Sequence, residues 1–466
     1  MRRERAGLHL SSGSRVAIVG GGPSGAFFAH FARKLAAERG IELEIVVFDG
    51  KSFGRRGPAG CNMGAGVVAE SLNRLLRAEG FELPEERIQR HIQGYRLYTG
   101  DSVLPLLGPA GQRDITAVFR GAGPRFSAFS YNVSFDDFLL QRVVDAAGGQ
   151  VKVIPEQVGE IGLPRRPAER ATLHYGSGRR QAVLEADLVV GAFGLNSAML
   201  RKMVDLDFGY KPPRTVRACQ TELPLDPSFI QQTLGDEVHT FILGIEGIRF
   251  GALTPKGVHV TVTIVGSRDL GLSDLSRFLD HPVVRSVLPP DWQPSGESCY
   301  CFPRLSLGAA TRPFADRLVI VGDAAFCRFF KNGFESAFLT ARLAAESALT
   351  RGVSARDFAR GYQNAARPLV RDNLFGHLLF QANDVVSRHR LLAETRRQLL
   401  AGPIDDPVVA LLHEIHWGML TGSLSYGQVT RLAMSPRLAV RAMGTLASVA
   451  LGQVGRPLAR SLGWRG

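Results

Sequence analysis

A glycine-rich turn between an apolar segment and a helical segment restricts the fold more than any other feature. Gly20, Gly22 and Gly25 have the spacing G-x-G-x-x-G. Residues 16–19 before the turn are apolar, and residues 26–39 after it have helical composition. In such a turn the first glycine permits a tight bend, the second lets a pyrophosphate approach, and the third lets the helix pack against the strand. The spacing therefore predicts a dinucleotide-binding strand–helix unit.

The residues around this turn predict the rest of the nucleotide site. Pro23 and Ser24 lie at the expected helix start, where free backbone N–H groups favour phosphate. Residues 43–48 form a second apolar segment that ends at Asp49, and an acid at this place can accept hydrogen bonds from ribose hydroxyls. We expect the cofactor to contact Gly20, Gly22, Pro23, Ser24, Gly25 and Asp49.

Two further strand-and-turn segments occur far along the chain. Residues 187–192 and 318–321 are apolar, and the second leads into a helical segment near 334–349. Between them, residues 238–266 alternate as antiparallel strands do, with 254–257 expected as a turn. We infer that the chain leaves a parallel nucleotide-binding sheet, builds a β-rich domain and returns.

These segments resemble motifs of the FAD-dependent hydroxylase and reductase superfamily. Residues 317–325, containing Gly322 and Asp323, resemble its second flavin motif, in which a Gly-Asp pair contacts the ribityl chain. Residues 187–197 resemble its middle motif. The resemblance implies FAD as cofactor, with Gly322 and Asp323 at the ribityl chain. It also implies that Gly333, at a helix start, lies beside the flavin ring, where N–H groups stabilise negative charge.

The predicted fold is α/β: a Rossmann-like FAD-binding domain of the two-dinucleotide-binding-domain type, an inserted antiparallel β-rich substrate domain and a helical C-terminal region. The FAD-binding domain is expected to be discontinuous, with the substrate domain inserted twice. The expected boundaries are 14–90, 130–210 and 310–350 for FAD binding, 91–129 and 211–309 for the substrate domain, and 351–466 for the helical region.

Within this superfamily, two segments resemble the geranylgeranyl reductase family. Residues 58–66, which contain Cys61, resemble its cysteine loop near the flavin, and residues 250–257 resemble its aromatic-Phe-Pro-Lys-Gly turn. The resemblance implies a reductase or dehydrogenase that transfers hydride between flavin and a lipophilic, isoprenoid- or quinone-like substrate. It makes Cys61 the candidate catalytic residue, which positions substrate or donates a proton. A small buried filler is the alternative role for this cysteine.

The chain departs from the family pattern at several positions. Phe250, Ala252 and Thr254 stand where the family has Tyr, Trp and Phe, which leaves a different substrate open. Phe193 replaces the acid of the middle motif, which bears on the use of NAD(P)H as electron donor, and Asn132 replaces an arginine. A flavin monooxygenase acting on an aromatic or lipophilic metabolite therefore remains an alternative. A membrane-associated electron-transfer flavoprotein served by an electron-donor protein is a third.

The net charge of +13 and the pI of about 10 suggest an anionic partner. No acid follows Glu414, and the apolar segment 436–452 is flanked by arginines. This basic C-terminal region, 431–466, predicts peripheral contact with an anionic membrane. Packing against the catalytic domain is the alternative. Nucleic acid is not expected, because no reading module accompanies the arginines.

The cysteines and histidines give no sign of a metal site or a disulfide framework. The five cysteines are dispersed and form no CxxC pair. Cys299 and Cys301 should face the same side of a strand, where simple packing is the favoured role over a redox pair. With no apolar run long enough to span a bilayer, we expect a cytoplasmic protein, peripheral at the inner membrane face if the basic region binds lipid.

Overall fold

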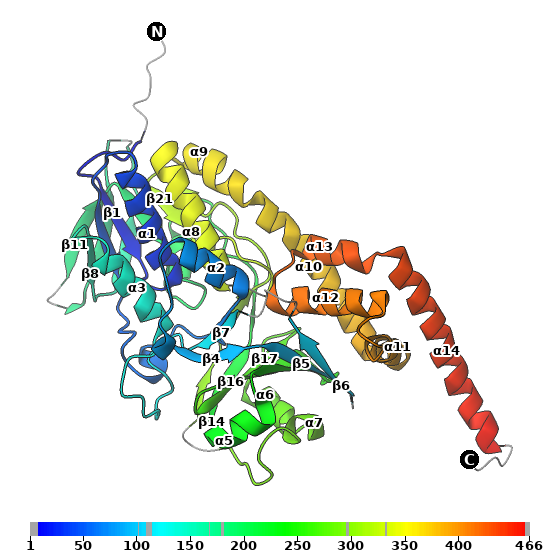
Figure 1. Cartoon of the computed structure of the whole chain (residues 1–466). Coiled ribbons are helices and arrows are strands. Elements are labelled where there is room, and N and C mark those ends of the chain that lie inside the picture. Colours follow the sequence, from blue (N-terminus) through cyan, green and yellow to red (C-terminus); the bar gives the residue numbers. More distant parts are fainter. Residues whose placement is uncertain are drawn as a thin grey trace.

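The computed structural model describes residues 8–100, 102–108, 114–166, 168–178, 181–294, 298–330 and 333–461. Figure 1 shows an α/β unit at the upper left, twisted sheets below it and a set of helices on the right, from which the last helix extends away. The chain crosses between the first two parts more than once.

The α/β unit is built on a six-stranded sheet in the order β20-β21-β12-β1-β2-β8. All pairings are parallel except that of β20 with β21. Helices α1 (Pro23–Ala37), α3 (Phe135–Asp145) and α8 (Gly333–Thr350) complete the unit, and α1 packs on α8. The strands are β1 (Arg15–Val19), β2 (Glu44–Phe48), β8 (Val151–Ile154), β12 (Leu188–Gly191), β20 (Phe314–Ala315) and β21 (Leu318–Ile320). The α/β fold predicted from the glycine turn is confirmed.

The second part is a seven-stranded sheet in the order β18-β14-β17-β16-β15-β5-β6. Its strands are β5 (Gly94–Thr99), β6 (Ser102–Leu107), β14 (Cys219–Pro224), β15 (Glu237–Ile242), β16 (Ile248–Lys256), β17 (His259–Gly266) and β18 (Cys299–Cys301). The sheet is β-rich and mostly antiparallel, as expected, but it is mixed, because β15 pairs in parallel with β5. The chain passes through the α/β unit between these two strands, and such a long connection permits a parallel return.

The turn predicted at 254–257 is wrong in position, because most of this segment is strand. Thr254 pairs with Thr261, and Lys256 pairs with His259, so both belong to β16. The chain reverses instead at Gly257 and Val258. Pro255 remains inside the ladder opposite Val260 because the hairpin pairing, rather than the local turn preference of proline, fixes the register.

Alternation along β17 gives the seven-stranded sheet two different faces. Val260, Val262 and Ile264 are fully buried in a core that also contains Phe278 of α6 (Leu272–Leu279). Their neighbours Thr261 and Thr263 point to the opposite face, as successive strand residues do. That second face carries the residues of the candidate substrate site described below.

A short three-stranded sheet, β3-β7-β4, lies between the two larger parts, and β9, β10 and β11 form another. The first consists of β3 (Val67–Val68), β4 (Ile88–Ile92) and β7 (Ile115–Val118), and the second of β9 (Val158–Gly162), β10 (Ala171–Tyr175) and β11 (Ala182–Ala186). Val68 and Val118 are buried in the core of the α/β unit, whereas Ile92 and Ile115 are buried in a core shared with the C-terminal helices. The small sheet therefore joins two cores.

The C-terminal region is helical, as expected. Its long helices are α10 (Asn364–Arg388), α11 (Arg390–Leu400), α12 (Pro407–Thr421), α13 (Tyr426–Ala433) and α14 (Pro436–Ser461). On α14, Leu438 and Val449 are buried, whereas Met443 and Leu451 are exposed, so the helix packs along one edge only. Arg465 and Trp464 of the predicted basic region lie outside the described residues, as do the side chains of Arg456 and Arg460. Nowhere in the described chain does a helix combine the length and hydropathy needed to span a bilayer.

Candidate cofactor and substrate site

In the glycine turn the backbone lies as close to neighbouring backbone atoms as the G-x-G-x-x-G spacing predicts. Gly20 has φ +110°, and a Cβ there would lie 2.5 Å from the carbonyl oxygen of Ala192, directly after the neighbouring strand β12. A Cβ on Gly25 would lie 1.9 Å from the carbonyl oxygen of Gly20. Both positions therefore require glycine, because any side chain would push α1 away from the sheet.

The start of α1 offers its backbone donors to a ligand. Gly22 is the N-cap, no side chain caps the helix, Pro23 occupies its first position, and its first turn contains no acid. The nearest atom to a Cβ on Gly22 is Nδ2 of Asn62, at 3.0 Å, so no backbone crowds this glycine. The Gly25 and Ala26 N–H groups donate to the Gly22 carbonyl at 2.9 and 3.0 Å, and the positive end of the helix dipole at this uncapped start suits a pyrophosphate.

Asp49 lies directly beside this turn. Its Oδ2 accepts a hydrogen bond from the Gly21 N–H at 2.7 Å, and its Oδ1 accepts one from the Lys51 N–H at 2.8 Å. Burial raises the pKa of Asp49, while these two backbone hydrogen bonds oppose the shift. Each oxygen keeps a free lone pair, so the carboxylate can still accept ribose hydroxyls as the sequence predicts.

The second motif carries an unsatisfied acceptor that fits the predicted ribityl contact. Oδ1 of Asp323 is buried, and no described residue donates a hydrogen bond to it. Gly322 has φ +70°, and a Cβ there would lie 2.1 Å from Oγ of Ser24, so the motif packs on the start of α1. Gly333 begins α8, and its Cβ position lies 3.4 Å from Oδ2 of Asp323. A buried acceptor without a donor is costly, and a hydroxyl of a bound cofactor would remove that cost.

Cys61 begins a loop whose carbonyl groups are held by three donors from separate parts of the chain. Lys51 Nζ donates to the Cys61 carbonyl at 2.9 Å, Arg120 to that of Met63 at 2.9 Å, and Gln220 Nε2 to that of Gly64 at 3.2 Å. Met63 adopts φ +60°, which costs energy for a residue with a side chain. The loop is therefore held in a strained shape by tertiary contacts.

Arg120, which follows β7 of the small sheet, belongs to a buried ion pair that the sequence did not reveal. Arg120 donates to Oδ1 of Asp136 at 2.9 Å and to Oδ2 at 2.8 Å, and the Asp136 carboxylate has no exposed surface. Asn132, which stands in place of the family's arginine, instead donates to Asp137 at 2.7 Å near the start of α3. Arg120 thus supplies a guanidinium from a different strand end, which only the tertiary structure identifies.

The Cys61 thiol is protonated at neutral pH. Burial raises its pKa above the ordinary value, and the hydrogen bond from the Met63 N–H, together with the nearby Arg120 guanidinium, offsets only part of that shift. The Met63 N–H donates to Sγ at 3.3 Å. A neutral thiol in this position suits proton donation or substrate packing better than nucleophilic attack.

The face of the seven-stranded sheet that carries Thr261 has a polar end. Lys256 is 1% exposed, and its Nζ lies 3.8 Å from Oε1 of Glu222 and 4.2 Å from the centre of the Phe119 ring. Thr261 Oγ1 donates to Oε2 of Glu222 at 2.6 Å. Burial lowers the pKa of Lys256 and raises that of Glu222, so both shifts favour the neutral forms. A Cβ on Gly66 would lie 3.6 Å from Nζ of Lys256, so the Lys256–Glu222 pair borders the cysteine loop.

The other end of the same face is aromatic. Phe329 and Phe330 follow the second flavin motif, and their rings lie 5.4 and 5.1 Å from the ring of Phe380 on α10. Phe250 of β16 packs against this cluster, and the Tyr426 hydroxyl donates to the Phe329 carbonyl. This face therefore has an apolar aromatic cluster at one end and the buried Lys256 and Glu222 side chains at the other.

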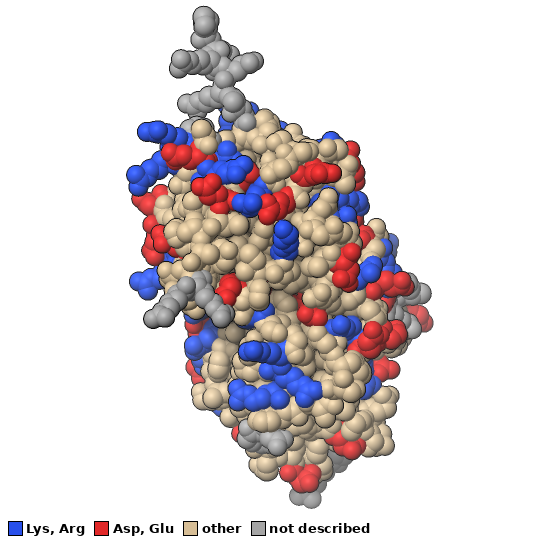
Figure 2. Space-filling model, turned by 90° about the vertical axis from the view of Figure 1, so that its left-hand side faces the viewer, with Lys and Arg blue, Asp and Glu red and all other residues tan. Residues whose placement is uncertain are grey.

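Exposed basic residues flank the nucleotide end. Lys51, Arg55 and Arg56 lie on the loop after β2, which packs against residues 121–131, including the exposed Arg125. These loops project at the lower left of Figure 1, the side that faces the viewer in Figure 2, and a group of basic side chains is visible in the lower half of that face. An anionic molecule approaching the site from this side is attracted.

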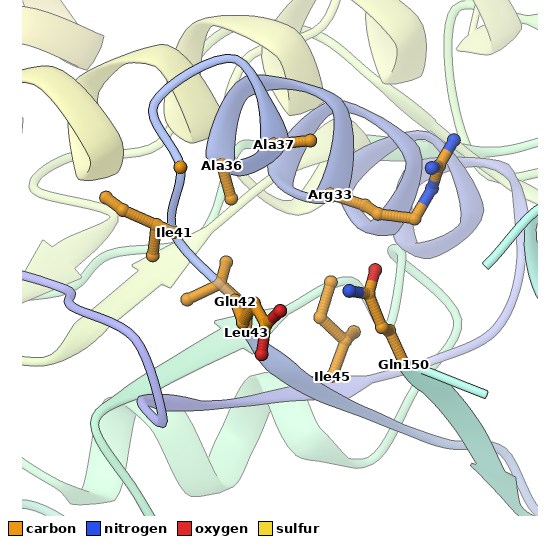
Figure 3. A pocket seen from close by; sticks show the side chains of 9 residues that line it. Arg33, Ala36, Ala37, Ile41, Glu42, Leu43, Ile45 and Gln150 are labelled. Atoms are coloured by element: carbon orange, nitrogen blue, oxygen red, sulfur yellow. The ribbon is translucent and has the colours of Figure 1, made fainter. Parts of the chain in front are cut away.

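A separate hollow lies at the amino ends of the parallel strands (Figure 3). It is lined by Arg33, Ala36 and Ala37 at the end of α1, by Gly40, Ile41, Glu42, Leu43 and Ile45 around the start of β2, and by Gln150. Ligands of open α/β sheets bind at the carboxyl ends of the strands, so this hollow is not the nucleotide site. Within the described residues, no group of three or more His, Cys, Asp or Glu is placed to hold a metal.

Comparison with known proteins supports this assignment of the fold. No protein-family model matches the chain. A geranylgeranyl diphosphate reductase of Synechocystis sp. (strain ATCC 27184 / PCC 6803 / Kazusa) is 24% identical over 232 residues, which is 48% of this chain and 50% of the relative. The match therefore spans about half the length of that protein.

Solved structures match over most of the chain. A geranylgeranyl bacteriochlorophyll reductase-like protein from Thermoplasma acidophilum has a TM-score of 0.63 at 15% identity, covering 91% of this chain and 99% of the other. A p-nitrophenol 4-monooxygenase from Pseudomonas putida DLL-E4 has a TM-score of 0.61 at 14% identity, covering 89% and 98%. These likenesses confirm the flavoprotein fold and the expected resemblance to FAD-dependent oxidoreductases.

Proposed function

We propose that the chain is an FAD-dependent reductase or dehydrogenase that transfers hydride between flavin and a lipophilic, isoprenoid- or quinone-like substrate. The observation that carries this proposal is the course of the chain after the second flavin motif: Asp323, which fits FAD, is followed a few residues later by Phe329 and Phe330 of the aromatic cluster. The partial match to a geranylgeranyl diphosphate reductase supports the same direction. FAD, when bound, supplies the hydride chemistry, and the protein supplies position and electrostatics.

The apolar and the polar residues of this site contact different parts of the proposed substrate. The aromatic cluster buries an apolar chain, which contributes about 25 cal/mol for each Å² removed from water. Lys256 and Glu222 mark the polar end, where an oxygen-bearing group of the substrate can be hydrogen-bonded. Cys61 keeps its proton and lies on the loop between these parts, so it is the candidate that delivers a proton or orients the substrate.

A first experiment tests the cofactor and the electron donor together. The purified protein should bind FAD, and anaerobic addition of NADPH or NADH should bleach the flavin absorbance if Phe193 is compatible with a nicotinamide donor. Bleaching by dithionite but by neither nicotinamide would assign the reducing step to an electron-donor protein. Failure to bind FAD at all would contradict the proposed function.

A flavin monooxygenase acting on an aromatic or lipophilic metabolite is the second candidate. Ala252 and Thr254 favour it, because they replace large aromatic side chains on β16 and leave a smaller, more polar lining. Substrate-dependent oxygen consumption with a hydroxylated product would establish this reaction. Anaerobic substrate reduction by the chemically reduced protein would establish the first.

Peripheral membrane contact through the basic region 431–466 remains part of the proposal. Arg437, Arg441, Met443 and Leu451 of α14 are exposed. Vesicle binding that survives deletion of residues 436–466 would exclude this segment as the main contact.

A further inference from the structure

The outward face of α10 is apolar, although nothing in the described chain covers it. Its large side chains there are exposed to 66% for Leu374, 42% for Phe375, 60% for Leu378 and 50% for Val385. These positions, together with the exposed Ala382, follow helical spacing and form one stripe along α10. A continuous apolar stripe on a surface helix marks an interaction site, whereas single exposed apolar residues do not.

The charges on α10 are distributed by sign between its two faces. Both acidic residues are engaged with the body: Asp384 pairs with Arg249 at 2.9 Å, and Asp372 accepts the backbone N–H groups of Tyr426 and Gly427 at 2.9 and 2.8 Å. The exposed charges are basic. Arg367 and Arg371 precede the apolar stripe and Arg388 follows it, and none of these three arginines forms an ion pair with a described residue.

The inward face of the same helix supports the candidate site. Asn373 accepts from the Phe329 N–H at 2.8 Å and donates to the Cys327 carbonyl at 2.9 Å. Phe380 contacts Phe329 and Phe330 of the same segment. One helix thus separates the aromatic end of the site from an apolar, basic outer surface.

We propose that the outward face of α10 docks the protein on the surface of an anionic lipid bilayer. A helix with an apolar stripe and flanking arginines lies in the headgroup region with its apolar side inserted. Arginines near such a surface are attracted by anionic lipid headgroups. A second copy of the chain fits less well, because a symmetric contact would bring two faces together that carry exposed arginines and no exposed acid.

This docking surface differs from the α14 segment and does not depend on the proposed reaction, since docking is measured without catalysis. The test is co-sedimentation of the full chain with vesicles of phosphatidylglycerol and phosphatidylcholine in equal parts, against phosphatidylcholine alone. We expect binding to the anionic vesicles that weakens at high salt. Leu374→Gln/Leu378→Gln should lower the affinity at least about tenfold, and Arg371→Gln/Arg388→Gln should lower it about fivefold for each arginine.

The matched control is Leu107→Gln/Leu272→Gln, which changes two leucines that are also largely exposed, on β6 and α6 (59% and 49%), and should leave binding unchanged. Unaltered melting temperature and flavin absorbance show that each variant is folded. Absence of binding by the natural chain, or an equal loss in the control, overturns the proposal. So does a dimer in analytical ultracentrifugation that Leu374→Gln/Leu378→Gln dissociates without any change in lipid binding, which would identify a second copy as the occupant.

Discussion

Asn62 donates a hydrogen bond from Nδ2 to Oδ2 of Asp136 at 2.7 Å, and this bond ties the loop of Cys61 to the first turn of α3. Asp136 is fully buried, and its carboxylate also receives the guanidinium of Arg120. Because Arg120 also holds the Met63 carbonyl, one buried charge pair controls the shape of the cysteine loop.

Arg120→Met is expected to destabilise the protein strongly. It leaves the buried Asp136 carboxylate without its cation, which costs roughly 3–5 kcal/mol in the free energy of unfolding. The measurement is urea unfolding. Arg120→Met/Asp136→Asn should recover part of the loss, because the orphaned charge is then absent. Arg74→Met, which breaks only an exposed pair with Glu70, should cost less than about 1 kcal/mol, and an equal loss in this control would refute the role of Arg120.

Gly25→Ala should abolish FAD binding. The added Cβ would lie 1.9 Å from the Gly20 carbonyl oxygen, so α1 must move away from the turn that holds the pyrophosphate. Gly308→Ala is the control, because a Cβ there has open space. The flavin-to-protein ratio after purification distinguishes the two, and a normal ratio in Gly25→Ala would contradict the proposed phosphate cradle.

Asp323→Ala should weaken FAD binding without unfolding the protein. The variant removes a buried acceptor for which a bound hydroxyl is the expected donor, and a hydrogen bond to a charged group contributes about 1.5–3 kcal/mol, or roughly 10- to 100-fold in affinity. Titration of the apoprotein followed by flavin fluorescence measures the change. Asp205→Ala, at an exposed position on α4 (Met199–Asp205), should bind as the natural chain does.

Asp274 gives a pH-dependent contribution to stability. Hydrogen bonds from Arg268, then from the Gly271 N–H and Arg277, hold its pKa below the ordinary value. A carboxyl group whose pKa is lower in the folded than in the unfolded state stabilises the folded protein at pH values above the unfolded-state pKa. This stabilisation is lost as the pH falls through the folded-state pKa. Asp274→Asn should therefore lower the free energy of unfolding by about 1–2 kcal/mol at neutral pH. The difference should shrink near pH 3, and a difference independent of pH would contradict the assignment.

The Cys61 thiol should react slowly with iodoacetamide in the native protein. Its pKa is raised by burial, so the reactive thiolate is scarce until the pH passes the ordinary thiol range. Peptide mapping by mass spectrometry should show Cys61 labelled faster after denaturation than before, at about pH 8.5. Cys61→Ala should retain FAD but lose most substrate reduction, and unchanged reduction would remove Cys61 from the mechanism.

The predictability of the site depends on whether its contacts are local in sequence. Gly20, Gly25 and Gly322 could be identified because backbone geometry at a strand–turn–helix junction restricts the residue type within a few positions. Gly333 could be placed at a helix start for the same reason. Arg120 and Gln220 could not be found, since their partners on the cysteine loop lie far away in sequence and no spacing rule links them.

The sequence by itself determined the nucleotide-binding unit of this protein, the insertion of a β-rich part and the helical C-terminal region, because periodicity and glycine spacing act over short stretches. The tertiary structure alone decided the parallel pairing of β5 with β15, the burial of Lys256 against Glu222 and the outward orientation of the apolar stripe on α10. Each of these depends on which distant surfaces meet when the chain packs, and burial and charge pairing are properties of that packing.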